Sequence, residues 1–317
     1  MDLRTPFRGV TARSGVLFRG PHGWGEFSPF ADYSDQRSAL WLQAALEAAY
    51  IPVSVPDGAC IPVNAIIGDR EDPREATHRA IHELGCTTIK VKLGTDLDSN
   101  LEKLEAITSE VRGAPDPQSA RIRIDINGRW NLDQAITALT AMSDFPIEYV
   151  EQPCPDRESL IALRRKIDIP IAVDESIRVD RYDTVREFAD IAILKVSPLG
   201  GLQATRRIAE QLNMPVRISS ALETSVGLFP SLVAAWELAP DHAAGVGTGV
   251  LFSEDLVTNP VIPVGGVIRV APIEPDPELL ERNTGDAELQ QLWRDRFHDA
   301  YDLLPEYVHR LVPAEIS

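Results

Sequence analysis

The stretch Arg121-Ile-Arg-Ile-Asp-Ile-Asn127 alternates polar or charged side chains with isoleucine. Successive side chains of a β-strand point to opposite faces, so we expect the isoleucines to pack together on one face. Arg123, Asp125 and Asn127 then share the other face, also in the interior. Charged groups in an interior are costly unless they are paired or bind a ligand. The strand alone therefore predicts either an internal salt bridge or a functional site.

The composition narrows the possible partners of the chain. Its 317 residues are enough for one large domain, or for a large and a small one, and its formal net charge is −17. Such a chain lacks the basic surface expected of a protein that binds nucleic acid or an anionic membrane. We see no apolar run that could span a bilayer and no secretory signal. Three scattered cysteines without a CxxC pair fit a reduced, cytoplasmic protein.

From Ile61 onward, short apolar segments alternate with helical ones. This spacing predicts parallel strands joined by helical crossovers. Eight such units favour a (β/α)8 barrel, in which active sites lie at the carboxyl ends of the strands. A doubly wound open sheet is the alternative, although its usual glycine-rich phosphate loop is missing. The predicted strands are 62–67, 87–92, 122–126, 147–151, 169–174, 191–196, 215–219 and 243–247, and the predicted helices are 73–84, 97–111, 132–142, 157–167, 181–188, 201–212 and 227–238.

The two ends of the chain differ from this repeat. Glycine-separated β-prone segments near the N-terminus predict a small antiparallel sheet, and an Ala- and Leu-rich helix is expected over 36–50. Two strands, at 261–264 and 267–270, and a helix over 277–296 are expected in the tail. We therefore predict a catalytic barrel of residues 61–255, covered by a capping domain that residues 1–60 begin and residues 256–317 complete.

Ionisable residues recur at the carboxyl ends of five consecutive predicted strands. Because these ends meet at one rim of a barrel, the side chains should lie close together. The recurrence is the strongest internal signal in the sequence. In chain order the strands end in Lys90-Val-Lys92, at Asp125, at Glu151, in Asp174-Glu175 and at Lys195.

Three carboxylates on neighbouring strands, Asp125, Glu151 and Asp174, would repel one another unless a cation lay between them. Ligands that are all oxygen favour a hard cation, which indicates Mg²⁺. Lys92 and Lys195 would flank this metal from opposite sides. A lysine beside a divalent cation can have its pKa lowered toward neutrality and act as a base. The set predicts removal of an α-proton from a metal-bound carboxylate substrate, with the metal stabilising the enediolate.

Other polar residues near this rim receive supporting roles. We expect Lys90 to line the barrel and pair with a carboxylate, and we assign the chemistry to Lys92, nearer the strand end. Arg123 and Asn127 would orient the substrate or support the metal ligands. Glu175 follows Asp174 directly, so a supporting role suits it better than metal binding.

Two further stretches follow the seventh and eighth predicted strands. Ser219 and Ser220 would either bind substrate or cap a helix. The short glycine-rich turn at 245–249, which contains Gly247 and Thr248, is of a kind that can bind an anion, although a short GxGxG is weak by itself.

Taken together, these motifs resemble the enolase superfamily, and within it the muconate-lactonising subgroup. Residues 219–227 and 247–256, with the strand-three pattern of Arg123, Asp125 and Asn127, are similar to o-succinylbenzoate synthases, in particular the short actinobacterial type. The resemblance covers essentially the whole chain. The superfamily motifs are KxK at 90–92, D-x-N at 125–127, EQP at 151–153, DES at 174–176 and LKVSPLGG at 194–201.

This resemblance implies an α+β cap over the barrel and a Mg²⁺-dependent dehydration. The substrate would be 2-succinyl-6-hydroxy-2,4-cyclohexadiene-1-carboxylate, the product o-succinylbenzoate, and the pathway menaquinone synthesis. Lys92 would remove the α-proton and then protonate the departing hydroxyl. Lys195 would stabilise the enediolate on the other face, by a cation–π contact with the ring.

The resemblance also implies roles for the remaining residues. Asp125, Glu151 and Asp174 would hold Mg²⁺, and a compact cap loop at 19–24 would face the substrate. The succinyl arm would be held at Ser219, Ser220, Gly247 and Thr248.

Two alternative functions stay open. An N-succinylamino acid racemase or dipeptide epimerase on the same scaffold would use Lys92 and Lys195 as two acid/base catalysts, one on each face of its substrate. A barrel that binds a metal or ligand without catalysis is the other. A monomer is compatible with the sequence.

Overall fold

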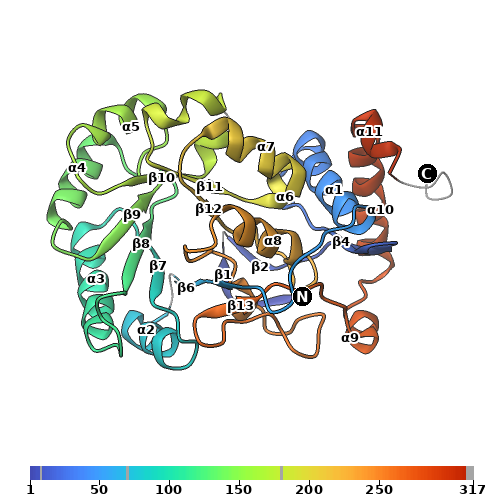
Figure 1. Ribbon diagram of the computed structural model, residues 1–317, viewed down its shortest axis with the longest axis horizontal. Coiled ribbons are helices and arrows are strands. Elements are labelled where there is room, and N and C mark those ends of the chain that lie inside the picture. Colours follow the sequence, from blue (N-terminus) through green and yellow to red (C-terminus); the bar gives the residue numbers. More distant parts are fainter. Residues whose placement is uncertain (8, 69–70, 179–180, 312–317) are drawn as a thin grey trace.

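The computed structural model describes residues 1–7, 9–68, 71–178 and 181–311 (Figure 1). Its largest sheet is parallel and curled, and each strand in it is hydrogen-bonded to the next strand along the chain. Apolar side chains fill the space between this sheet and the helices outside it. The strands are β6 (Asn64–Ile67), β7 (Thr88–Lys92), β8 (Arg121–Asp125), β9 (Ile147–Glu151), β10 (Ile171–Val173), β11 (Ile191–Leu194) and β12 (Val216–Ile218).

The predicted eighth strand is reduced to isolated bridges, yet it joins the two edges of the sheet. Ala244 pairs in parallel with Val63, just before β6, and Gly245 pairs in parallel with Ser219, just after β12. The amide of Asn64 donates to the carbonyl of Ala244 over 3.0 Å. The prediction of a (β/α)8 barrel is therefore confirmed, with its last position shorter than expected.

Helices cover the outside of the barrel, as the spacing predicts. Four of them begin at an Asp or Asn whose side chain accepts a hydrogen bond from an amide of the first turn, which satisfies a donor that the helix leaves free. These helices are α2 (Pro73–His82), α3 (Leu97–Arg112), α4 (Leu132–Ala141) and α5 (Arg157–Arg164), followed by α6 (Val196–Leu199), α7 (Leu202–Leu212) and α8 (Phe229–Leu238).

The helical segment predicted over 181–188 is present, as a 3₁₀ helix and not an α-helix: η2 (Tyr182–Glu187). Val185 and Phe188 are both fully buried. Residues three apart lie on the same side of a 3₁₀ helix, so one tight turn is enough to bury this pair. Two other 3₁₀ helices lie at the rim, η1 (Glu175–Arg178) and η3 (Thr248–Leu251).

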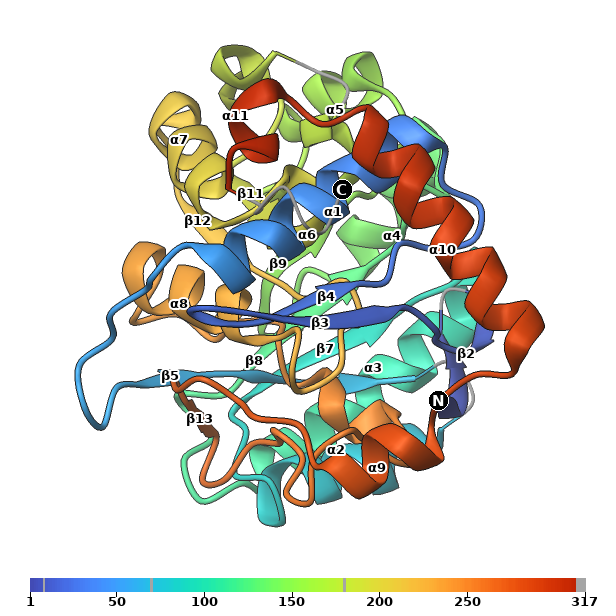
Figure 2. The same cartoon turned by 90° about the vertical axis from the view of Figure 1, so that its right-hand side faces the viewer.

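Elements from both ends of the chain share a second core beside the barrel (Figure 2). The predicted antiparallel pair is present as β3 (Val16–Gly20) and β4 (Gly23–Phe27), and the predicted helix as α1 (Asp35–Tyr50). Phe27 packs edge to face on Trp293 of α10 (Ala287–Asp302), with ring centroids 5.7 Å apart. These elements form the cap. Its boundary near residue 60 stays a prediction.

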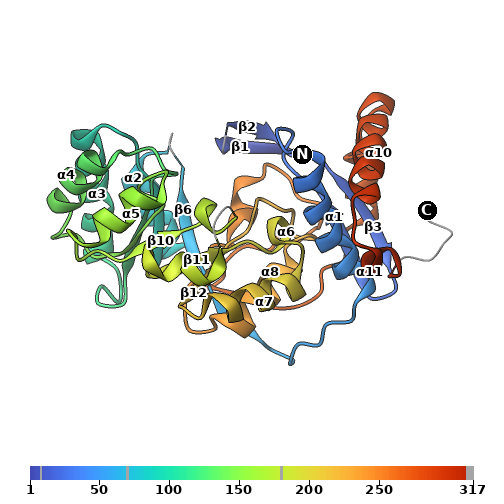
Figure 3. The same cartoon turned by 90° about the horizontal axis from the view of Figure 1, so that it is seen from above.

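A second hairpin, of β1 (Asp2–Phe7) and β2 (Val10–Ala12), lies near the junction of cap and barrel (Figure 3). Leu3 of β1 forms an antiparallel bridge with Phe252, which follows the eighth barrel position. The N-terminus is thereby attached to the barrel rim.

The tail departs from the prediction in two places. Residues 261–264 are not a strand, because Pro263 has no amide to donate to a ladder. β13 (Val267–Arg269) pairs instead with β5 (Cys60–Pro62).

The helix predicted over 277–296 is also wrong, because it is interrupted. Asn-Thr-Gly at 283–285 favours helix poorly, and Asp286 starts α10 by accepting from the Leu289 amide. The helices are α9 (Pro277–Arg282), α10 and α11 (Glu306–His309). No helix of the described residues has both the length and the apolar character needed to cross a membrane.

Helix α1 docks on the barrel at the turn that follows β11. Gln43 donates to the carbonyl of Gly200 over 2.7 Å, and Glu47 accepts from the amide of Gln203 over 2.8 Å. Glu47 therefore satisfies an amide at the start of α7, whose N-cap residue, Gly201, has no side chain. Gly201 has a φ of +108°, and a Cβ there would lie 2.7 Å from Glu47 Oε2.

Gly201→Ala should lower the free energy of unfolding by about 1–3 kcal/mol, because alanine is strained at this φ and would collide with Glu47. The midpoint of urea unfolding measures this loss. Gly94→Ala is the matched control, since no atom lies within 4 Å of a Cβ built there. We expect it to change stability by less than about 0.5 kcal/mol. Equal effects of the two substitutions would contradict the argument.

Candidate active site

Strand β8 has the two faces that its sequence predicts. Ile122 and Ile124 are fully buried in the core between the sheet and the outer helices. Arg123 and Asp125 are buried on the opposite side, inside the barrel. The interior charges therefore need partners, and the neighbouring strands supply them.

The register of the sheet brings charged strand ends to one level. Lys92 of β7 pairs with Asp125 of β8, and Asp125 pairs with Glu151 of β9. Asp174 directly follows β10, and Lys195 directly follows β11. Five consecutive strands thus deliver these residues to the carboxyl-terminal rim, as the sequence predicts.

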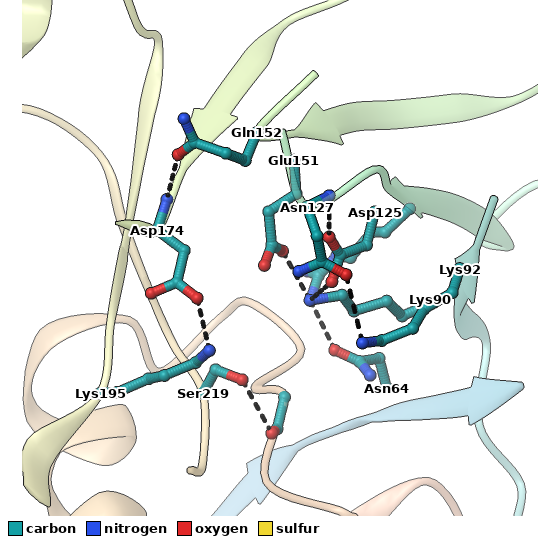
Figure 4. A network of polar contacts seen from close by, with 12 residues as sticks. Asn64, Lys90, Lys92, Asp125, Asn127, Glu151, Gln152, Asp174, Lys195 and Ser219 are labelled. Carbon is teal, nitrogen blue, oxygen red and sulfur yellow. Dashed lines mark hydrogen bonds and ion pairs between the residues drawn. The ribbon is translucent and has the colours of Figure 1, made fainter. Parts of the chain in front are cut away.

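Lys90 lies between two of the carboxylates (Figure 4). Its Nζ is 3.0 Å from Asp125 Oδ2 and 2.7 Å from Glu151 Oε2. Burial would lower the pKa of Lys90, but the charges of Asp125 and Glu151 outweigh it and raise this pKa well above its ordinary value. Lys90 therefore stays protonated and is unsuited to act as a base.

Lys92 and Lys195 reach toward the space between the strand ends from opposite sides (Figure 4). Both side chains are half-buried. Lys92 Nζ donates to Asn127 Oδ1 over 3.2 Å, and Lys195 Nζ lies 2.5 Å from Asp174 Oδ2. Two amines are thus presented to one space, each beside an oxygen acceptor.

Gln152 supports the position of Asp174. Its Oε1 accepts from the amides of Asp174 and Ser176, both over 3.3 Å, and its Nε2 donates to Ser176 Oγ over 2.7 Å. The residue itself has a left-handed φ of +43°. Sequence reasoning gave Gln152 no role, although it stands in the Glu-Gln-Pro segment that carried the resemblance.

The carboxylates suit a divalent cation in their chemistry. Burial, together with the charges of Asp125 and Asp174, raises the pKa of Glu151 to about 7. A cation among these oxygens would relieve that repulsion, and an all-oxygen donor set suits Mg²⁺. Among the described residues, no three Asp, Glu, His or Cys side chains are already arranged to hold a metal ion. The lysine ammonium groups provide the positive charge instead.

A cavity of about 440 Å³ opens over these groups between the cap and the barrel. The barrel contributes both lysines at the rim and two of the carboxylates, and the cap contributes Pro6, Gly9, Phe30 and Tyr33. The predicted residues that line it are Lys90, Lys92, Asp125, Asn127, Asp174, Glu175, Lys195, Ser219, Ser220 and Thr248.

Arg123 lies below this cavity and does not line it. Its guanidinium donates to Glu148 Oε2 over 2.7 Å, to Asn64 Oδ1 over 2.9 Å and to the carbonyl of Ala243 over 2.6 Å. Burial favours the neutral form of Glu148, yet the hydrogen bonds and charge of Arg123 hold its pKa below the ordinary value. Arg123 therefore forms the internal salt bridge that the strand alone allowed, and it ties β8 to the first and last strands.

Two other expectations differ from the structure. Gly247 does not line the cavity, and a Cβ there would lie 3.4 Å from a side-chain carbon of Pro263. The cap loop expected over the substrate, at 19–24, lies elsewhere: the indole of Trp24 donates to Glu274 over 2.8 Å. The hairpin of β1 and β2 and the segment with Phe30 and Tyr33 cover the cavity instead.

The barrel, its charged rim and the cap define a class of capped (β/α)8 enzymes. The family model Enolase C-terminal domain-like matches residues 72–276, and Enolase N-terminal domain-like matches residues 1–49. The crystal structure of muconate cycloisomerase from Pseudomonas fluorescens is similar, with a TM-score of 0.69, 18% identity and coverage of 85% of this chain and 97% of that chain. The crystal structure of N-succinyl Arg/Lys racemase from Bacillus cereus ATCC 14579 has a TM-score of 0.67 and 19% identity, and the match covers 83% of this chain and 87% of that chain. These identities show the fold alone.

Related sequences narrow the family. The o-succinylbenzoate synthase of Thermobifida fusca (strain YX) is 42% identical over 86% of this chain and 86% of its own length. The o-succinylbenzoate synthase of Mycobacterium tuberculosis (strain ATCC 25618 / H37Rv) is 40% identical over 96% of this chain and 93% of its own length. The chain therefore belongs to the enolase superfamily and, within it, to the o-succinylbenzoate synthase family. It is an enzyme of the lyase class, and enzymes of this superfamily use a divalent metal.

Lys90→Met should lower the free energy of unfolding by about 3–5 kcal/mol in EDTA, because it leaves Asp125 and Glu151 buried without their cation. Urea unfolding measures the loss, and added Mg²⁺ should recover part of it. Arg74→Met is the control. It removes an exposed ion pair with Glu110 and should cost about 0–1 kcal/mol. A Lys90→Met protein as stable as the Arg74→Met protein would contradict this view of the site.

Proposed function

We propose that this enzyme dehydrates 2-succinyl-6-hydroxy-2,4-cyclohexadiene-1-carboxylate to o-succinylbenzoate, with Mg²⁺ as its metal, in menaquinone synthesis. The observation that carries the proposal is that this chain is 40–42% identical, over most of its length, to proteins named o-succinylbenzoate synthase. The geometry supports it, because Lys92, Lys195 and two of the proposed metal ligands face one cavity large enough for a small organic acid. The proposed partner is thus a small carboxylate, and a monomer would contain the whole site.

Asp125, Glu151 and Asp174 would hold the metal. When bound, the metal would supply positive charge that neutralises the substrate carboxylate and stabilises the enediolate. Lys90 would keep Asp125 and Glu151 ionised and in place, since its ammonium contacts both. Gln152 would hold the backbone of Asp174 through its amide oxygen. These two residues act on the ligands and do not reach the reacting atoms.

Lys92 would carry out both proton transfers. As the free amine it takes the α-proton, and the electron pair of that C–H bond moves into the enediolate. The same ammonium then donates the proton to the hydroxyl on the neighbouring carbon, whose C–O bond breaks as water leaves. One residue on one face serves both steps, so the elimination is syn. The ring becomes aromatic, which makes the second step favourable.

Lys195 would act on the opposite face without transferring a proton. Its ammonium stabilises negative charge as the enediolate forms, and it can stay over the ring through a cation–π contact. The nearby Asp174 carboxylate, 2.5 Å away in the structure, orients the amine toward the cavity.

The far end of the cavity suits the succinyl arm. Ser220 and Thr248 are buried and lie 2.9 Å apart through their hydroxyls, and Ser219 lines the same wall. Hydroxyl groups can donate to a carboxylate. Phe30 and Tyr33 of the cap provide an apolar cover that excludes water.

A racemase of N-succinylamino acids, or a dipeptide epimerase, is the second candidate. The position of Lys92 and Lys195 on opposite sides of the cavity favours it, because two-base racemisation needs one base on each face.

A direct assay separates the two functions. We expect the purified enzyme with Mg²⁺ to dehydrate the cyclohexadiene acid with a kcat/KM at least about 10²-fold above that for racemisation of N-succinylamino acids. The aromatic product is followed by absorbance and racemisation by polarimetry. EDTA should abolish turnover, and Mg²⁺ should restore it. Activity that survives EDTA would refute the metal assignment, and a preference for racemisation would refute the proposed reaction.

Variants of the two lysines test their separate roles. Lys92→Ala should lower kcat for dehydration by at least about 10³-fold, because the base on that face of the substrate is lost. Lys195→Arg keeps the charge and should retain measurable dehydration, whereas a two-base racemase should lose racemisation. Lys166→Ala, at an exposed position outside the cavity lining, is the control. Dehydration that survives Lys92→Ala would rule out the mechanism.

A further inference from the structure

The segment that follows β12 forms one wall of the cavity. Ser219, Ser220, Ala221 and Leu222 all line it. Leu222 has a left-handed φ of +69°, a conformation that is strained for a leucine and persists only where the surroundings hold it. The wall therefore depends on contacts made outside the cavity.

Three buried carboxylates, one of them within the segment, accept hydrogen bonds that hold it. Glu223 accepts from Ser197 Oγ and from the amide of Ala221, both over 2.7 Å. The other two lie in the cap and in the segment that follows η3. Glu26 of β4 accepts from Thr224 Oγ1 over 2.5 Å and from the Thr224 amide over 3.1 Å, and Asp255 accepts from Ser225 Oγ over 2.6 Å.

Arg13 adds a second contact from the cap. Its Nε donates to the carbonyl of Leu222 over 3.2 Å, at the residue with the strained backbone. Its Nη2 donates to the carbonyl of Ser28, whose hydroxyl donates to Glu26 Oε1 over 2.7 Å. Arg13 and Glu26 are thus joined through Ser28 into one buried network of the cap.

The same arginine also contacts the cap side of the cavity. Its guanidinium lies 4.1 Å over the ring of Phe30, which lines the cavity opposite the barrel. Neither Arg13 nor Glu26 lines the cavity itself, and both are 7% exposed. Arg13 contacts lining residues on both sides of the cavity, Leu222 of the barrel and Phe30 of the cap, and Glu26 contacts Thr224 beside the barrel wall.

We propose that Arg13 and Glu26 are positioning residues through which the cap sets the shape of the wall formed by Ala221 and Leu222. Arg13 holds the Leu222 carbonyl and the Phe30 ring at a fixed spacing, and Glu26 fixes Thr224. The cap would then influence substrate fit by shaping a barrel loop, in addition to the side chains it presents. The effect on substrate rests on the proposed function, whereas the effect on the loop does not.

Enzyme kinetics provide the first test. Arg13→Met and Glu26→Ala should raise KM for the cyclohexadiene acid by about tenfold or more and change kcat by less than about threefold, because the reacting groups stay in place. Arg13→Lys and Glu26→Gln each keep a polar partner for the loop and should recover part of the loss. These conservative variants also carry the test if the others fail to fold.

Glu47→Ala is the matched control, because Glu47 is another cap carboxylate that accepts a barrel amide. That amide, of Gln203, lies outside the cavity wall. We expect its KM to stay within about twofold of the wild-type value, whatever stability is lost. A rise in KM as large as that of Glu26→Ala would overturn the proposal, since it would reflect general loosening of the cap.

Hydrogen exchange provides the second test and needs no activity. Amides of 221–225 should exchange at least about tenfold faster in Arg13→Lys and Glu26→Gln than in wild type, with protection of β7 to β9 unchanged. Unchanged exchange at 221–225 would overturn the proposal. If the wild-type enzyme fails to dehydrate the acid, the proposed function fails while this measurement still decides the role of Arg13 and Glu26.

Discussion

The site depends on the contact of one buried ammonium group with two buried carboxylates. Lys90 places its Nζ within 3.0 Å of both Asp125 and Glu151, inside a barrel where uncompensated charge is very costly. The register of β7, β8 and β9 creates this contact, and the contact in turn lets acidic side chains remain in the interior. Positions nearer the rim, Lys92 and Asp174 among them, are then available for chemistry.

A second constraint is the attachment of the cap to the barrel through buried polar groups. Glu47 accepts a hydrogen bond from the amide of Gln203 in α7, and Glu26 accepts one from the hydroxyl of Thr224 after β12. Each of these contacts satisfies a donor at the interface, so removing either carboxylate while the cap stays docked would leave that donor buried and unpaired. The Glu26 attachment lies next to the cavity wall formed by Ala221 and Leu222, whereas the Glu47 attachment lies outside it. The two attachments therefore differ in how near they come to the cavity.

Much of the barrel and its rim could be predicted because they follow from period and spacing. Alternating Ile122, Arg123, Ile124 and Asp125 define the two faces of a strand, and the recurrence of charge after each strand places the rim residues. The errors lie where long-range contacts decide local structure. The segment predicted to be helical over 181–188 forms the 3₁₀ helix η2, and its Val185 and the following Phe188 are buried in the core of the barrel. The roles of Gln152 and Leu222 depend on partners brought close only by folding.

By itself the sequence determined the periodic strands, the charged strand ends and the family resemblance, because side-chain alternation and motif spacing are local properties. Only the tertiary structure decided that Lys90 contacts two carboxylates at once, Asp125 and Glu151, and that Lys92 lies beside Asn127. It also decided that Arg123 ties barrel strands together and that Pro6, Gly9, Phe30 and Tyr33 cover the site. Those outcomes depend on how strands far apart in the chain are registered and on where the cap docks, and no local pattern encodes either.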